Sequence, residues 1–267
     1  MSATPAWPPR SAPRLFLTTR LAAGDVQRIE GQQAHYLSRV MRVGPGDTII
    51  LCDNATGEWA ARVQSAGKRS VIAETVELLR CREDVPDLVL CVALLKKPRF
   101  DLVLEKATEL GVRTIQPVIT RRCVADALNA ERARTIITEA AEQCARTALP
   151  ELALPVTLAG ILRGWDPART LYFADEAGGA QAADAFAARI GPAALLIGPE
   201  GGFDDAERDA VRATAAARAI TLGPRVLRAE TAAIAAVSLW MGVAGDWADA
   251  RADSPATPSA ACPPGLR

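Results

Sequence analysis

The sequence lacks the residue patterns that hold metals and nucleotides. Its 267 residues include six cysteines without a CxxC pair, and a single histidine, His35. A zinc site needs closely spaced cysteine or histidine ligands, so we expect no bound metal. The GxxxxGKS/T pattern of phosphate-binding loops and the GxGxxG pattern of dinucleotide-binding turns are also absent. The sequence therefore argues against a zinc protein and against the common nucleotide-binding motifs.

The chain also lacks net charge and long apolar runs. Lys plus Arg and Asp plus Glu each number 31, which excludes a uniformly basic nucleic-acid binder but not a locally basic one. Two regions are in fact basic, residues 10–42 and residues 96–122. No apolar run approaches the roughly 20 residues that a membrane span requires, and the first residues contain no apolar signal-peptide stretch. We expect a cytoplasmic protein without membrane association.

Composition divides the chain into two domains between two tails. Residues 1–13 and 249–267 are rich in proline and lack periodicity, so we expect both tails to be disordered. Residues 14–80 are rich in strand-forming segments, and the polar residues 81–87 are typical of a linker. Within 14–80, the pattern predicts one short helix at residues 35–43 and strands at residues 14–18, 48–53, 57–67 and 70–79.

Residues 88–248 alternate between apolar strands and amphipathic helices. This alternation predicts an α/β domain with a mainly parallel sheet. Asp204 is a candidate helix cap with Glu207 as its capping-box partner, and Gly111 is a candidate helix C-terminus. The predicted strands are 88–94, 114–120, 171–175, 193–198 and 219–223, and the other predicted helices are 99–110, 129–148 and 229–246.

Two predicted strands end in a Gly-Pro peptide. These segments are LLIGPEGG, residues 195–202, and ITLGPRVLRAET, residues 220–231. Open α/β sheets bind ligands at the carboxyl ends of their strands, and glycine allows the main chain to approach a ligand closely. Glu200 would repel a phosphate, so a ligand with a cationic or neutral face fits better. S-adenosylmethionine, with its cationic sulfonium, is such a ligand; a tight turn without a ligand is the alternative.

The second segment carries side chains suited to catalysis. Arg228 can stabilise negative charge that develops on a carbonyl oxygen. Glu230 and Thr231 fall near the start of the last predicted helix, whose N–H groups favour a polar or anionic ligand. A surface ion pair between Arg228 and Glu230 is the alternative.

Several stretches together resemble one enzyme family. They are HYLSRVMRVGPGD (35–47), KATELGV (106–112), RRC (121–123), EAAEQCAR (139–146), LLIGPEGG and LGPRVLRAETAA. Over roughly residues 14–247 the chain resembles the bacterial small-subunit ribosomal RNA uracil-N3 methyltransferases, the RsmE-type branch of the SPOUT superfamily. The resemblance implies an α/β fold class with an N-terminal PUA-like RNA-binding β-barrel and a C-terminal SPOUT domain containing a trefoil knot. It also implies a homodimer that uses S-adenosylmethionine.

The resemblance places the strand-end loops around the cofactor. Glu176, with Gly178 and Gly179, would add a third wall after the strand at 171–175. Arg228 and Glu230 would be catalytic, with Glu200 as an alternative proton acceptor. The implied cofactor-binding residues are Ile197, Gly198, Glu200, Gly201, Gly202, Leu222, Gly223, Val226, Leu227, Arg228 and Thr231.

The implied substrate is 16S ribosomal RNA or the small ribosomal subunit. Uracil N3 carries a proton with a pKa of roughly 9 to 10, similar to that of a phenol. The reaction therefore needs a proton acceptor or groups that stabilise negative O2 and O4. A ribose 2′-O methyltransferase and a non-catalytic RNA-binding assembly module are the alternatives. The candidate phosphate contacts are Arg14, Arg39, Arg42, Arg121, Arg122 and Arg146, each with a merely solvated role as the alternative.

Overall fold

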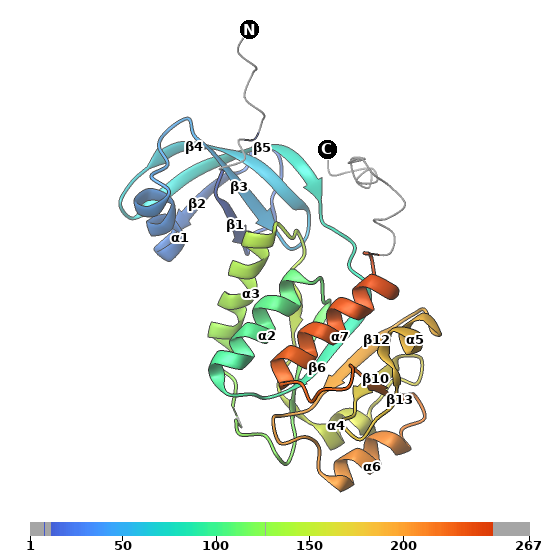
Figure 1. Ribbon diagram of the computed structural model, residues 1–267. Helices are drawn as coiled ribbons and strands as arrows, with labels where there is room; N and C mark the ends of the chain where they lie inside the picture. Colours follow the sequence, from blue (N-terminus) through green and yellow to red (C-terminus); the bar gives the residue numbers. More distant parts are fainter. Residues whose placement is uncertain (1–7, 9–11, 126, 248–267) are drawn as a thin grey trace. The chain divides into compact units, whose positions relative to one another are not determined.

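The computed structural model describes residue 8, residues 12–125 and residues 127–247 (Figure 1). Its contacts divide the chain into two compact units. Among the described residues, the first unit contains those up to Asp84 together with Ala141–Ala148, and the second contains Val85–Ala140 and residues 149–247. The tails that we predicted at 1–13 and 249–267 lie almost wholly outside the described residues.

Residues 141–148 were expected in the second domain but group with the first unit. The reason is polar pairing rather than local sequence. Glu142 accepts a hydrogen bond from the Phe16 N–H (2.8 Å), and Arg146 pairs with Glu83 (3.2 Å). Partners more than sixty positions apart in the chain leave no periodic signal, so composition could not assign this segment.

The first unit is a mixed five-stranded sheet in the order β1-β3-β4-β5-β2. β1 pairs with β3 in parallel and the other pairs are antiparallel. Its core contains Leu15, Leu37, Ile49 and Trp59. The strands are β1 (Arg14–Leu17), β2 (Val26–Glu30), β3 (Thr48–Asp53), β4 (Gly57–Ala66) and β5 (Ser70–Cys81).

The helical part of this unit differs from the prediction. α1 (Gly31–His35) continues into a π-helical segment, η1 (Tyr36–Val40), so the helix lies several residues before the predicted 35–43. Arg42 follows with a φ of 55°, which is incompatible with continued right-handed helix. Strand β2 was not predicted because most of its residues are polar and exposed, and only Ile29 is buried.

The second unit contains an eight-stranded parallel sheet in the order β11-β13-β10-β12-β6-β7-β8, with β9 also paired to β7. The predicted strands are all present. Three two-residue strands and two six-residue helices were missed, because such short elements show no period. The strands are β6 (Leu88–Ala93), β7 (Thr114–Ile119), β8 (Glu151–Leu152), β9 (Val156–Thr157), β10 (Thr170–Ala174), β11 (Ala180–Gln181), β12 (Ala193–Ile197) and β13 (Ala217–Thr221).

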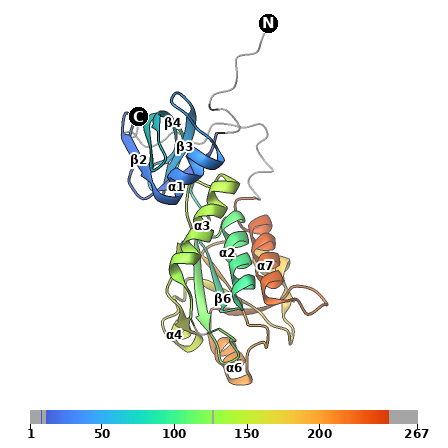
Figure 2. The ribbon, with the colours of Figure 1, turned by 90° about the vertical axis from the view of Figure 1, so that its left-hand side faces the viewer.

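Helices cover both faces of this sheet. Alternate residues of β6 separate the faces: Leu88, Leu90 and Val92 belong to one apolar cluster and Cys91 to the other. α2 and α7 lie side by side on the first face (Figures 1 and 2), and α4 and α6 contribute to the cluster on the second. The helices are α2 (Lys97–Glu109), α3 (Ala130–Cys144), α4 (Leu158–Arg163), α5 (Ala182–Ala187), α6 (Asp205–Ala213) and α7 (Ala229–Val243).

Strands β13, β10 and β12 are neighbours in this parallel sheet. Their carboxyl ends therefore lie along one edge, and the loops that leave them are brought together. Two of these loops are the Gly-Pro segments that the sequence singled out. The trefoil knot implied by the resemblance stays a prediction.

Candidate functional site

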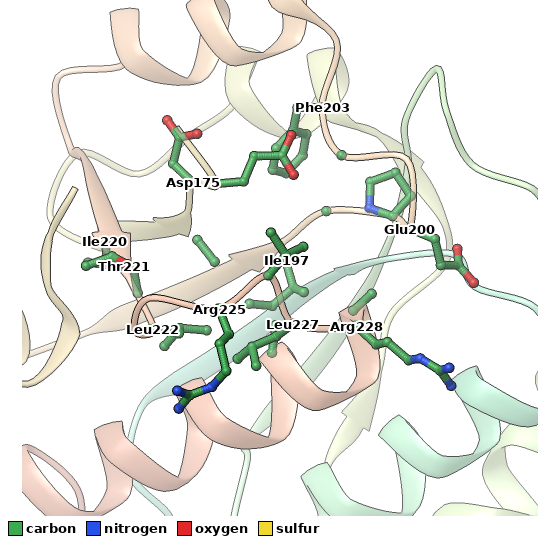
Figure 3. Close-up of a pocket in the computed structure, with 18 of the residues that line it drawn as sticks. Asp175, Ile197, Glu200, Phe203, Ile220, Thr221, Leu222, Arg225, Leu227 and Arg228 are labelled. Atoms are coloured by element: carbon green, nitrogen blue, oxygen red, sulfur yellow. The ribbon is translucent and has the colours of Figure 1, made fainter. Parts of the chain in front are cut away.

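A cavity of about 350 Å³ lies at this edge of the second unit (Figure 3). It is lined by the loops that follow β10, β12 and β13, by the first turn of α7, and by Arg99 of α2 and Arg208 of α6. This volume falls in the roughly 300–1,000 Å³ range of small-molecule sites. Three consecutive loops of the parallel sheet edge thus enclose a space of ligand size.

Most of the residues that we proposed for cofactor binding line this cavity. Gly201 and Thr231 do not: the Gly201 carbonyl accepts a hydrogen bond from Arg122, and Thr231 is exposed on α7. Glu176, proposed for a third wall, also lines the cavity. The lining residues from the proposed set are Ile197, Gly198, Glu200, Gly202, Leu222, Gly223, Val226, Leu227 and Arg228.

The cavity has an apolar centre between charged ends. In Figure 3, Ile197 and Leu227 lie near the middle of the view, and Leu222 lies to their left. Asp175 and Glu200 lie at opposite ends of that view. Such a lining suits a ligand with a flat apolar ring and separate polar and cationic groups.

The acidic end is neutralised by arginines of α6. Asp175 is only 5 % exposed, and its two oxygens pair with Arg208 (3.3 Å) and Arg212 (2.6 Å). Arg208 also pairs with Glu176 at 3.1 Å. A buried carboxylate with two guanidinium partners is compensated rather than free, so this network fixes the loop after β10. Asp175 and Arg208 were not predicted as site residues, although the position of Asp175 directly after an apolar strand is a signal for a site residue.

One glycine in the loop after β12 is required by its surroundings. Gly202 has a φ of 67°, and a Cβ at this position would lie 2.5 Å from Glu176 Oε1. Any larger residue would displace Glu176 and strain the backbone. The paired glycines of GPEGG are therefore explained in part by the close approach of the β10 loop.

The two proposed catalytic residues have different surroundings. Arg228 is exposed at the N-cap of α7 and lines the cavity. Glu230 does not line it: the residue is 8 % exposed, and its Oε1 lies 3.7 Å from Arg99 Nε. Among the described residues, Glu230 Oε2 has no hydrogen-bond partner. Arg99 also donates to Glu200 Oε1 (3.1 Å), so one guanidinium lies between both carboxylates.

The six arginines proposed as phosphate contacts also differ in their surroundings. Arg14 donates to the buried Glu58 at 2.7 Å, and Arg146 is 5 % exposed and paired with Glu83. Because these two guanidinium groups hold the interior of the first unit, we withdraw both as phosphate contacts. Arg39 and Arg42 are exposed on the same unit. Arg121 and Arg122 contact the loop after β12 and the start of α6.

Within the ranges that the structure describes, no group of three His, Cys, Asp or Glu side chains is arranged to hold a metal ion. No described helix is both long and apolar enough to cross a bilayer. Burial raises the pKa of the Cys91 thiol to about 12, so this cysteine is not poised as a nucleophile.

Two family models match the two units. Residues 82–241 match an RNA methyltransferase domain, and residues 29–76 match an RNA methyltransferase PUA domain. The parallel sheet with its strand-end cavity, together with these matches, defines the class: the chain is an RNA methyltransferase with a PUA domain.

Relatives that share one name match over most of the chain. The ribosomal RNA small subunit methyltransferase E of Synechocystis sp. is 30% identical over 245 residues, which cover 86% of this chain and 79% of the relative. The corresponding enzyme of Rickettsia conorii is 29% identical over 232 residues, which cover 84% and 93%. The chain belongs to the ribosomal RNA small subunit methyltransferase E family.

Solved structures agree with this assignment. A ribosomal RNA small subunit methyltransferase E from Neisseria gonorrhoeae, bound to S-adenosyl methionine, matches with a TM-score of 0.81 at 28% identity. That match covers 88% of this chain and 99% of the other. A methyltransferase from Legionella pneumophila, in complex with the same cofactor, matches with a TM-score of 0.80 over the same shares.

Proposed function

We propose that this chain transfers the methyl group of S-adenosylmethionine to N3 of a uridine in 16S ribosomal RNA. The names of the relatives and the cofactor in two related structures support the substrate class and the methyl donor. The observation that carries the proposal is the geometry of the cavity. The loops after β10, β12 and β13 enclose one cavity, and Arg228 lies at its rim.

The residues present fit the cofactor. The cavity volume of about 350 Å³ suits a ligand of this size. Ile197, Leu222 and Leu227 would hold the adenine ring against apolar surface, while Gly198 and Gly223 allow main chain to approach the ligand. When bound, S-adenosylmethionine supplies an electrophilic methyl group on its sulfonium, so the protein need only orient the acceptor and manage charge.

Arg228 stabilises the negative charge that builds up on the uracil oxygens when N3 loses its proton. Its guanidinium is exposed, and it has no ion-pair partner among the described residues. A free cation at the mouth of a partly enclosed cavity interacts more strongly with developing charge than it would in bulk water. Arg225, which also lines the cavity, projects in a different direction in Figure 3.

Glu200 is the better of the two proposed proton acceptors. It lines the cavity, whereas Glu230 lies outside the lining and against Arg99. Glu200 and Arg228 lie toward the same end of the cavity in Figure 3. We therefore assign proton removal to Glu200, and we assign Glu230 to positioning Arg99.

RNA binding is assigned to exposed cations of the first unit. Arg39 and Arg42 lie on and just after η1, and neither has an ion-pair partner within the described residues. N3 is on the Watson–Crick edge, so the target uracil must be unpaired or extruded from its stack before reaction. Contacts to the phosphates would hold the RNA while the base enters the second unit.

A homodimer in the cytoplasm completes the proposal. The exposed apolar residues Leu102 on α2, Leu239 on α7 and Trp247 after α7 would be covered by a second copy. Light scattering on the purified protein tests this assignment, and a monomer at working concentrations would contradict it.

The deciding experiment is to map methylated uridines by mass spectrometry in ribosomal RNA from a strain without this protein. We expect loss of one N3-methyluridine from 16S RNA, restored by the wild-type gene and not by the gene with Arg228→Ala. Loss of a ribose 2′-O methyl group would identify the other chemistry, and an unchanged methylation map would contradict both.

A further inference from the structure

The loop that follows β12, residues 198–204, contains three glycines and lines the cavity. Glycine loses more conformational freedom on ordering than any other residue, so such a loop tends toward mobility. Within the loop, the Gly202 N–H donates to the Pro199 carbonyl at 2.9 Å. Arginines on other elements supply further polar contacts to the loop.

Arg122, from the segment that follows β7, covers the middle of this loop. Its Nη1 donates to the Gly201 carbonyl at 2.8 Å. A Cβ placed on Gly201 would lie 3.4 Å from Arg122 Cβ and 3.5 Å from its Cδ, so the aliphatic stem lies at van der Waals contact over the glycine. Gly201 does not line the cavity; its lack of a side chain leaves the space in which Arg122 packs.

Arg121 holds the point where the loop becomes a helix. Its backbone N–H donates to Glu207 Oε1 (2.8 Å) and its Nη1 donates to Asp204 Oδ2 (2.9 Å). Asp204 and Glu207 form the reciprocal capping box at the start of α6. One residue therefore contacts both members of the cap.

Arg99 contacts the loop at a third residue. It donates to Glu200 Oε1 at 3.1 Å from helix α2. The loop is thus attached at Glu200, Gly201 and Asp204 to two elements that are distant in sequence. Those three attachments fix the loop in its cavity-lining conformation through contacts within the protein.

We propose that Arg121 and Arg122 are positioning residues that order the cofactor-binding loop in advance, rather than contacts to RNA phosphates. The inference rests on the proposed cofactor. A loop that is already ordered does not lose its conformational entropy on binding, and affinity rises accordingly. Both arginines are exposed. Arg122 contributes more than Arg121, because its stem adds van der Waals contact over Gly201, whereas the Arg121 side chain is 70% exposed and solvent weakens its ion pair.

The test compares Arg122→Ala with Arg122→Lys and with Arg134→Ala, a control on an exposed arginine of α3. We expect Arg122→Ala to raise the dissociation constant for S-adenosylmethionine about tenfold in calorimetric titration, the loss of roughly one charged hydrogen bond. Arg122→Lys, which keeps the stem and one donor, restores most of the affinity. Arg134→Ala has no effect.

A second readout needs no cofactor. Amide hydrogen exchange across residues 198–204 should accelerate in ligand-free Arg122→Ala and remain slow in Arg122→Lys. Gly201→Leu should reproduce the Arg122→Ala result, because the new side chain displaces the arginine stem. The combination of Gly201→Leu and Arg122→Ala should then be less than additive.

The outcomes separate the hypotheses. Unchanged cofactor affinity and unchanged exchange in Arg122→Ala would overturn the inference. If Arg122→Ala left cofactor affinity unchanged but lowered both RNA affinity and the salt dependence of RNA binding, Arg122 would be a phosphate contact instead. Absence of cofactor binding by the wild-type protein would contradict the proposed function, whereas the exchange measurement would still test the loop.

Discussion

At the residue scale, most charges near the cavity are paired. Asp175 pairs with Arg208 and Arg212, and Glu200 with Arg99. Arg225 and Arg228 are the exceptions, since both line the cavity, are exposed and have no ion-pair partner in the described part of the chain; of the two, Arg228 lies toward Glu200 in Figure 3. A guanidinium that is already neutralised would add little to a developing negative charge, so its lack of a partner supports the catalytic assignment.

Arg228→Ala should lower kcat about 100-fold or more and change cofactor affinity much less. The physical reason is that the proposed interaction strengthens only as the uracil becomes negative. Single-turnover methylation and calorimetric titration measure the two quantities. Arg225→Ala, three residues away on the same rim, is the matched control, with a smaller expected effect. Equal losses of turnover and affinity in Arg228→Ala would indicate a binding role.

Asp53 organises the interior of the first unit. It is 2 % exposed and accepts hydrogen bonds from the N–H groups of Leu21 (2.7 Å) and Gly57 (3.1 Å) and from Thr56. Burial alone would raise the pKa of Asp53, yet these backbone hydrogen bonds lower it below the usual value. The charged carboxylate is therefore the form that the fold favours.

Asp53→Asn should lower the free energy of unfolding at pH 7 by about 2 kcal/mol. The NH₂ group of asparagine is itself a donor and would face the N–H and O–H donors that now bind the Asp53 carboxylate. In the wild type, this contribution is present above the unfolded pKa of about 3.9 and is lost as the pH falls through the lower folded pKa. Urea unfolding from pH 7 to pH 3 should show a shallower decline in the variant. Asp47→Asn, on an exposed carboxylate, is the control, and the same decline in both variants would refute the assignment.

At the scale of elements, the site depends on where parallel strands end. β10, β12 and β13 contribute neighbouring loops, and α6 and α7 begin directly after two of them. The capping box of Asp204 and Glu207 fixes the start of α6 and hence the end of the cofactor loop. The Glu207 N–H and, less strongly, Arg121 hold the pKa of Asp204 below its usual value, so the cap persists into acid.

Asp204→Ala should accelerate amide exchange in the first turn of α6 about fivefold, because the cap and the Arg121 contact are lost together. Exchange of the same amides in Asp209→Ala, which removes an equal charge from the exposed face of α6, provides the comparison. Acceleration of similar size in both variants would mean that net charge, not the cap, governs this helix end.

At the scale of the whole molecule, the two units carry different tasks. The exposed and unpartnered cations of the first unit lie apart in sequence from every lining residue of the cavity, all of which belong to the second unit. Variants in one unit should therefore affect RNA binding and variants in the other should affect cofactor binding.

Replacing Arg39 and Arg42 together by alanine should weaken RNA binding and reduce the slope of its salt dependence by about 1 to 2, while leaving the cofactor dissociation constant unchanged. Fluorescence anisotropy across a salt series measures the slope. Lys68→Ala, at the exposed turn between β4 and β5, is the control. An unchanged slope in the double variant would place the RNA contacts elsewhere.

The sequence by itself determined the α/β class, the predicted strands, the capping box and the loops that end in Gly-Pro. These features are local: they depend on periodicity, on turn-forming residues and on spacings of three or four positions. The same local patterns identified the Gly-Pro loops as parts of one site, because parallel strands place their carboxyl ends together.

Only the tertiary structure decided which charges are free. Arg14 pairs with Glu58, and Arg146 pairs with Glu83. Glu230 lies against Arg99, and Arg122 packs over Gly201. Each of these contacts joins residues that are dozens of positions apart in the chain. Electrostatic and packing energies depend on distance in space, and no pattern of neighbouring residues records that distance.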